Sequence, residues 1–255
     1  MKVIHLSTSN PVNPDGATSG DPELAWVQLL VVLIAPSLGA LSGLWLWPGP
    51  VGGTLYALCK VVLYGVPLYL LIKRLGFRGL LARPFQGCTR RSTAIGFVTG
   101  AIAGVTILLL WLFVLSGRVN VTYVLEAMQA NGMTAVLKFL AFAAWLCLVN
   151  SLLEEIVFRW YVDERLLKIG LPFPFALPIS ASIFTMHHVI VLSAFFNWPL
   201  VVIGSVGVFS AGALWSLLLR RSNSLAPGWI SHALVDAAIM LVGWWILRSA
   251  QLDPA

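Results

Sequence analysis

The sequence predicts an all-α fold, a polytopic transmembrane helical bundle, and three observations lead to that class. Apolar residues make up 59% of the 255 residues and charged residues only 10%, whereas soluble domains average about 45–50% and about 25%. The mean hydropathy is high, at +0.89. Several continuous apolar runs are long enough to cross a hydrocarbon core of about 30 Å as helices, which takes roughly 20 residues each. This composition excludes a soluble enzyme, a disordered chain and a nucleic-acid-binding module.

The apolar runs predict seven spans, with an eighth or re-entrant helix as an alternative. Continuous runs favour helices over the short alternating strands of a barrel. Residues 1–22 are polar and are expected to form a flexible cytoplasmic tail, residues 23–249 a single transmembrane domain, and residues 250–255 a short tail. The expected spans are 24–47, 52–72, 94–116, 138–162, 173–197, 199–219 and 228–248.

The distribution of basic residues predicts the orientation. Most Lys and Arg fall in the predicted loop at 73–91 and in the loops after the fourth and sixth spans. With seven spans these loops lie on one side, which the positive-inside rule assigns to the cytoplasm. We therefore expect an integral multi-pass protein of a bacterial inner membrane, with its N-terminus in the cytoplasm.

Acids and histidines inside the spans are few. A charge at mid-membrane costs about 3 kcal/mol even on lenient insertion scales, so such residues indicate function. They belong to the fourth, fifth and seventh spans: Glu154, Glu155, His187, His188, His232 and Asp236. We expect these three helices to bring their ionisable side chains to one buried site.

The fourth span contains two adjacent glutamates with different expected roles. At about 100° per residue, Glu155 and Arg159 share a helix face and Glu154 points about 100° away. The i,i+4 order of Glu155 and Arg159 favours a structural ion pair. Glu154 is then expected to lack a partner in its own helix and to need one from another helix. The alternative is that Glu154 is a second structural carboxylate, hydrogen-bonded to helix neighbours such as Asn150 or Ser151.

The fifth and seventh spans each contain a further i,i+4 pair, Phe184 with His188 and His232 with Asp236, whereas His187 points away and is expected to pack. If the fifth helix starts at Pro178, then Glu154, His188 and Asp236 lie about 12–15 Å below the cytoplasmic face. A carboxylate with an imidazole can activate water, and a second histidine with a hydrogen-bonding neighbour can stabilise an oxyanion. Glu154 with His188, and His232 with Asp236, fit these two roles.

These residues also form three motifs: EExxxR, FxxxH and HxxxN/D. Together they resemble the motifs of the CPBP family, which includes type II CAAX prenyl endopeptidases and Abi proteins, over a motif-bearing core at 138–247. The resemblance implies an intramembrane glutamate-type endopeptidase without a metal or cofactor, acting on a membrane-associated peptide or protein substrate in the lipid bilayer. Carried over, the catalytic residues are Glu154, His188, His232 and Asp236, and the supporting residues are Glu155, Arg159 and Phe184.

One departure and two alternatives accompany this interpretation. The prenyl endopeptidases usually have Asn at the position of Asp236, so Asp236 must either carry a proton or act by orienting His232. A zinc-dependent intramembrane protease could use His188, His232 and either Glu154 or Asp236 as ligands, since two histidines and a carboxylate form a known zinc set. A non-catalytic membrane immunity or scaffold protein, or a proton-coupled carrier, could use the same acids.

Overall fold

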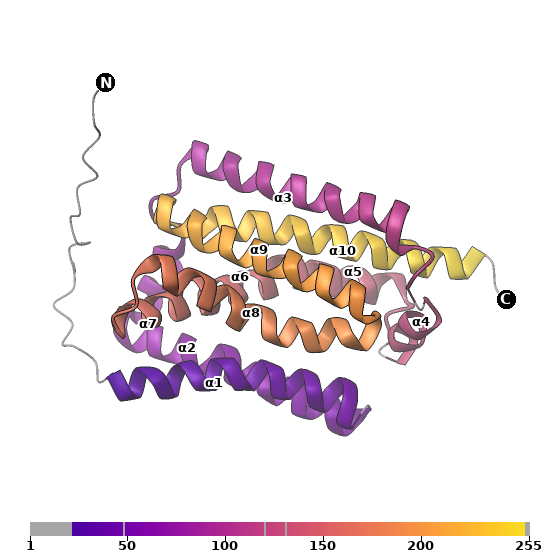
Figure 1. The fold of residues 1–255 in the computed structure, drawn as a ribbon, viewed down its shortest axis with the longest axis horizontal. Coiled ribbons are helices and arrows are strands. Elements are labelled where there is room, and N and C mark those ends of the chain that lie inside the picture. Colours follow the sequence, from indigo (N-terminus) through magenta and orange to yellow (C-terminus); the bar gives the residue numbers. More distant parts are fainter. Residues whose placement is uncertain (1–21, 48, 120, 131, 253–255) are drawn as a thin grey trace.

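The structure, a computed structural model, describes residues 22–252 except 48, 120 and 131, and these residues form helices and connections without a strand (Figure 1). Within them, seven helices are long and apolar enough to cross a membrane. The prediction of an all-α polytopic bundle is therefore confirmed. The tail expected at 1–22 lies outside the described residues apart from Pro22. Of the short tail expected at 250–255, the described residues 250–252 continue the last helix to Leu252.

The helices form a continuous series along the chain. They are α1 (Pro22–Leu41), α2 (Pro50–Ala82), α3 (Arg90–Leu110), α4 (Val121–Ala130), α5 (Val136–Ala144), α6 (Ser151–Glu154), α7 (Asp163–Lys168), α8 (Phe173–Phe195), α9 (Trp198–Ser222) and α10 (Ala226–Leu252). Short π-helical turns extend α1 and α3, at Ser42–Leu46 and Trp111–Leu115. Longer π-helical segments, Trp145–Asn150 and Glu155–Val162, join α5, α6 and α7 into one span.

Helix α2 continues through residues that we expected in a loop. The basic residues after position 72 are helical as far as Ala82, with one break at Gly76, where φ is +71°. Lys and Arg are good helix formers and can extend their charges away from apolar surface. Their charges therefore mark where a helix leaves the apolar layer, not where it ends. The fourth span is likewise longer than predicted, and its end is tied to α2 by a bidentate ion pair between Arg74 and Glu164.

Helices distant in sequence pack together in the bundle. Figure 1 shows α1 and α2 at one edge, α3 at the opposite edge, and α9 and α10 next to α3. Helix α3 packs mainly on α10, through Gly96, Gly100 and Gly104. A Cβ at Gly96 would lie 2.4 Å from the carbonyl oxygen of Pro227 in α10. Small residues allow this close backbone approach between membrane helices.

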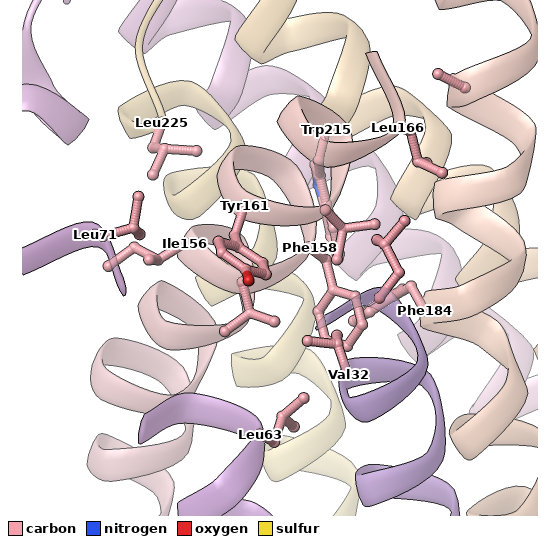
Figure 2. Packing of buried hydrophobic residues seen from close by; sticks show 14 of the residues in the cluster. Val32, Leu63, Leu71, Ile156, Phe158, Tyr161, Leu166, Phe184, Trp215 and Leu225 are labelled. Carbon is pink, nitrogen blue, oxygen red and sulfur yellow. The ribbon is translucent and has the colours of Figure 1, made fainter. Parts of the chain in front are cut away.

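The main apolar core surrounds the second half of the fourth span (Figure 2). Phe158 and Tyr161 are fully or almost fully buried there, among side chains from α1, α2, α8 and α9. The Tyr161 hydroxyl donates a hydrogen bond to Gln28 Oε1 of α1, at 3.0 Å. The fourth span, which contains both glutamates, is thus held in the interior of the bundle.

Candidate functional site

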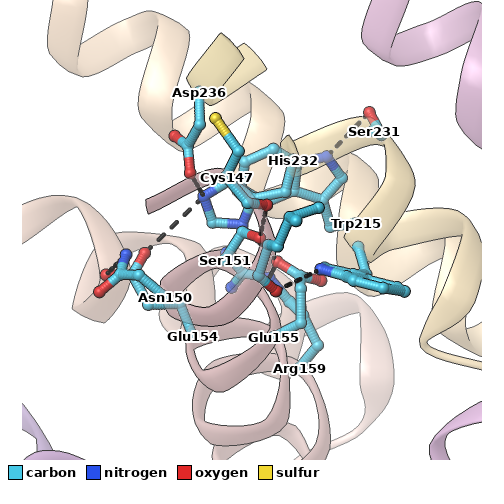
Figure 3. Close-up of polar contacts among 12 residues, drawn as sticks. Cys147, Asn150, Ser151, Glu154, Glu155, Arg159, Trp215, Ser231, His232 and Asp236 are labelled. Carbon is cyan, nitrogen blue, oxygen red and sulfur yellow. Dashed lines mark hydrogen bonds and ion pairs between the residues drawn. The ribbon is translucent and has the colours of Figure 1, made fainter. Parts of the chain in front are cut away.

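The two glutamates lie where the fourth span changes from α-helix to π-helix. Glu154 ends α6 and Glu155 begins the π-helical segment, and the two residues are only 4% and 0% exposed. A π-helix turns less than 100° per residue, because each hydrogen bond closes over five residues. Consecutive side chains therefore diverge less than we expected from an α-helix. Both carboxylates contact one imidazole, that of His232 in α10 (Figure 3).

The His232 ring lies among three carboxylates. Its Nδ1 is 3.1 Å from Glu155 Oε1, and a carboxylate only accepts, so Nδ1 donates this hydrogen bond. Its Nε2 faces Glu154 Oε2 at 3.7 Å and Asp236 Oδ2 at 3.8 Å. The Trp215 indole of α9 stacks on the ring, with centroids 4.0 Å apart and an interplanar angle of 15°. These contacts fix the ring with its Nε2 edge toward Glu154 and Asp236.

The ion pair expected between Glu155 and Arg159 is present. Arg159 Nε is 3.7 Å from Glu155 Oε1, and Arg159 is fully buried. Its guanidinium carbon lies 4.4 Å from the centroid of the Phe184 ring. Within the described residues no Arg159 nitrogen makes a hydrogen bond, so Coulomb attraction and cation–π contact hold it. Gly228 lets α10 pass close to this pair, since a Cβ there would lie 2.8 Å from Glu155 Oε2.

Helix α8 begins where the fifth span was expected to begin, five residues before the start that the depth estimate assumed. It starts at Phe173, with Pro178 inside the helix, a position that membrane helices tolerate. His188 therefore lies about 22 Å along the helix from its start, against about 15 Å for a start at Pro178. The depth estimate for His188 depended on a start at Pro178 and does not apply to a helix that starts at Phe173. One turn earlier, the ring centroid of Phe184 is 6.1 Å from that of His232.

His188 is next to the buried carboxylates without bonding to them. Its Nδ1 lies 2.9 Å from the carbonyl oxygen of Phe184. Because a carbonyl only accepts, Nδ1 carries a proton and Nε2 of the neutral ring is an acceptor. The rings of His188 and Phe184 are in contact, at 4.6 Å. Among the described residues no hydrogen bond or ion pair joins His188 to Glu154. His187 is buried and stacks on Phe158, in agreement with its expected packing role.

Helix α2 contributes two residues that we did not predict. Lys60 Nζ lies 3.3 Å from Glu154 Oε1, and the Tyr64 hydroxyl lies 3.4 Å from the same oxygen. Asn150, one turn before Glu154, donates from Nδ2 to Oε1 at 3.0 Å. Glu154 therefore has a partner in its own helix, Asn150, which the structural alternative named, as well as partners in α2 and α10. We call Lys60, Glu154, Glu155, Arg159, His232 and Asp236 the buried charged cluster.

A signal for Lys60 was present in the sequence. It interrupts the apolar run expected at 52–72 and is the only charged residue within it. A lysine inside a membrane span is as costly as an acid and equally needs a partner. Lys60 was not among the predicted site residues, because that prediction rested on acids and histidines alone. Asp163 is a second omission, since we assigned it to a span end and it is buried, at 7% exposed.

The zinc alternative has limited geometric support in the described part of the chain. Within it, no three His, Cys, Asp or Glu side chains are arranged to hold a metal ion. Glu154 Oε1 already accepts hydrogen bonds from Lys60 Nζ and Asn150 Nδ2. The alternative remains a hypothesis for elemental analysis.

The fold and the buried charged cluster define an integral multi-pass membrane protein with ionisable groups in its interior. Residues 136–238 match the family model described as Type II CAAX prenyl endopeptidase Rce1-like. This segment contains all three motifs, and the resemblance to CAAX-type proteases is thereby confirmed. The class of enzyme that the match implies is a protease. Searches among curated proteins and among solved structures gave no match.

Proposed function

We propose that the protein is an intramembrane endopeptidase of glutamate type that cleaves a membrane-associated peptide or protein. The main support is the asymmetry of the Glu154 carboxylate. Its Oε1 receives hydrogen bonds from Lys60 and Asn150, whereas Oε2 faces His232 Nε2 at 3.7 Å. One oxygen is held in place and the other is directed toward an imidazole, the arrangement that a positioned base needs.

In the proposed reaction Glu154 Oε2 accepts a proton from a water molecule. The water oxygen attacks the scissile carbonyl carbon and forms a tetrahedral intermediate. His188 helps to orient the water through Nε2, the acceptor nitrogen of its neutral ring. When the C–N bond breaks, the protonated Glu154 returns the proton to the leaving amine. The water is consumed, Glu154 is regenerated, and the products are an acid and an amine.

His232 and Asp236 are proposed to stabilise the oxyanion of the intermediate. For this role both nitrogens of His232 must carry protons, with Nδ1 donating to Glu155 and Nε2 to the oxyanion. An ionised Asp236 would repel the oxyanion. Asp236 therefore either carries a proton or acts by orienting His232, whose Nε2 lies 3.8 Å from Oδ2.

Glu155, Arg159 and Phe184 are proposed to support this arrangement. Glu155 fixes the ring of His232, and Arg159 neutralises Glu155. The Phe184 ring lies next to the imidazoles of His188 and His232. None of the three needs to touch the substrate.

The variant Glu154→Gln tests the proposal, because it keeps the shape of the side chain and removes the base. We expect the purified parental protein in lipid nanodiscs to cleave a membrane-bound peptide at a rate that falls at least about 100-fold in the variant. The first probes are a farnesylated peptide ending in a CAAX sequence and the same peptide without the lipid, with products identified by mass spectrometry. In cells, new protein termini that depend on Glu154 identify the natural substrates.

The controls separate the alternatives. Folding of the variant is checked by thermal unfolding in detergent. Cleavage at the parental rate by Glu154→Gln contradicts the proposal, and so does a parental protein that cuts neither peptide and produces no Glu154-dependent terminus in cells. Stoichiometric zinc, lost together with activity under chelation, would favour the metal mechanism instead. A scaffold or immunity function would survive Glu154→Gln.

A further inference from the structure

A closed ring of hydrogen bonds joins four side chains from two helices, and one of the four is Glu154. Lys60 Nζ donates to the Tyr64 hydroxyl oxygen at 2.9 Å, and the Tyr64 hydroxyl donates to Asn150 Oδ1 at 2.7 Å. Asn150 Nδ2 donates to Glu154 Oε1 at 3.0 Å. Lys60 Nζ also donates to that oxygen, at 3.3 Å, and closes the ring. Each group acts in a role its chemistry allows, since a hydroxyl can donate once and accept from another donor.

The ring follows from two i,i+4 pairs on neighbouring helices. Lys60 and Tyr64 lie one turn apart on α2, and Asn150 and Glu154 lie one turn apart on the fourth span. Both pairs therefore project from single faces that oppose each other. The side chains of Lys60 and Glu154 are 19% and 5% exposed. An ammonium group inside a membrane span is costly without a partner, so the position of Lys60 beside the Glu154 carboxylate needs an explanation.

Neutralising a buried carboxylate does not by itself require this geometry. Any cation near Glu154 would reduce the cost of its charge, with either oxygen as the contact. Here Lys60 and Asn150 both donate to Oε1, and none of the hydrogen bonds among the described residues goes to Oε2. The ring thus determines which oxygen of Glu154 is free.

We infer that Lys60 is a positioning residue for Glu154, acting together with Tyr64 and Asn150 to keep Oε2 directed at His232 and the attacking water. This inference rests on the proposed function, since it assigns a purpose to the orientation of the base. Lys60 itself touches neither the substrate nor the water. Helix α2 lies outside the segment that matches the family model, so the assignment comes from the contacts alone.

The test compares Lys60→Met with the parental protein, using the farnesylated CAAX peptide in nanodiscs. We expect kcat per folded protein to fall about 10–100-fold, as for a base displaced by about 1 Å, and KM to change less than about twofold. Lys60→Arg restores part of the rate, because it keeps a donor cation. Tyr64→Phe opens the ring at one bond and has a smaller effect on kcat. In the Glu154→Gln background, Lys60→Met causes no further loss.

Lys73→Met is the matched control, since it removes an exposed lysine from the same helix. It should have the parental kcat. If Glu154→Gln is inactive while Lys60→Met has the parental kcat, this inference is wrong and the proposed function stands. If the parental protein does not cleave, or Glu154→Gln cleaves normally, the proposed function fails and the inference with it. Should Lys60→Met not fold in detergent, Tyr64→Phe decides, and a parental kcat in that variant overturns the inference.

Discussion

The contact between α3 and α10 leads to a quantitative prediction for Gly100→Ala. A Cβ at this position would lie 2.7 Å from Ser231 Cα and 2.8 Å from Ser231 O, both backbone atoms of α10. Ordinary contacts of a Cβ begin at 3.4 Å, so the helices must separate by about the difference, ~0.7 Å. Overpacking of this kind costs about 1–3 kcal/mol of the free energy of unfolding.

A second glycine isolates that cost from helix propensity. Gly207 lies in α9 with nothing within 4 Å of an added Cβ, so Gly207→Ala should only gain the roughly 0.5–1 kcal/mol of propensity. Gly100→Ala should have the same gain in helix propensity, but overpacking against α10 should also destabilise it. The two variants should thus differ by about 1–3 kcal/mol, or roughly 2–12 °C in Tm at about 2–4 °C per kcal/mol for a chain of this size. Thermal unfolding in detergent, followed by Trp fluorescence, measures the difference.

The structure also predicts which helix moves in Gly100→Ala. Helix α3 lies at the edge of the bundle (Figure 1), whereas α10 is held to the fourth span by the contacts of His232 and by the close approach at Gly228. We expect α3 to shift outward and kcat of the folded variant to stay within about threefold of the parental value. Equal Tm values for Gly100→Ala and Gly207→Ala would refute the packing argument. A tenfold loss of kcat would show that α10 moved instead.

Two further predictions concern the environment of His232. Arg159→Gln leaves Glu155 buried without its cation, so we expect a loss of about 3–5 kcal/mol in the free energy of unfolding, partly recovered in Arg159→Gln/Glu155→Gln; detergent unfolding checks both, and no recovery would contradict the pairing. Trp215→Phe keeps a ring over His232 but removes the hydrogen bond from Nε1 to Ser231 Oγ. We expect a loss of about 1 kcal/mol, measured in the same way, and an unchanged Tm would show that this bond contributes nothing.

Much of the fold could be predicted because each membrane helix corresponds to a long apolar run in the sequence. Composition and run length were sufficient for the number of spans. They were insufficient for the helix ends, since a helix stays hydrogen-bonded internally after it leaves the apolar layer. The extension of α2 past Lys73 and the short helix α4 (Val121–Ala130) both lie where apolar character fades.

The candidate site was predictable in part for a related reason. The i,i+4 pairs Glu155–Arg159 and His232–Asp236 depend only on local helix geometry, and both are present. Contacts between helices depend on helix rotation and depth, which no local pattern specifies. Both glutamates contact His232, whereas among the described residues His188 is bonded to the Phe184 carbonyl and not to Glu154. Lys60 could have been predicted as a site residue from the free-energy cost of a charge inside a span. Its pairing with Glu154 could not.

Charge balance explains why the buried charged cluster combines these residue types. With Asp236 ionised, as in the alternative in which it orients His232, the three carboxylates and two cations, Lys60 and Arg159, leave one excess negative charge, and an unbalanced charge in a bilayer costs about 3 kcal/mol. One further proton on His232, whose ring nitrogens face all three carboxylates, brings the sum to zero. A proton on Nε2 is also the donor that the proposed oxyanion role requires. The protonation state that makes the cluster tolerable in a membrane is thus the one that the proposed reaction uses, and removing either cation should disturb both.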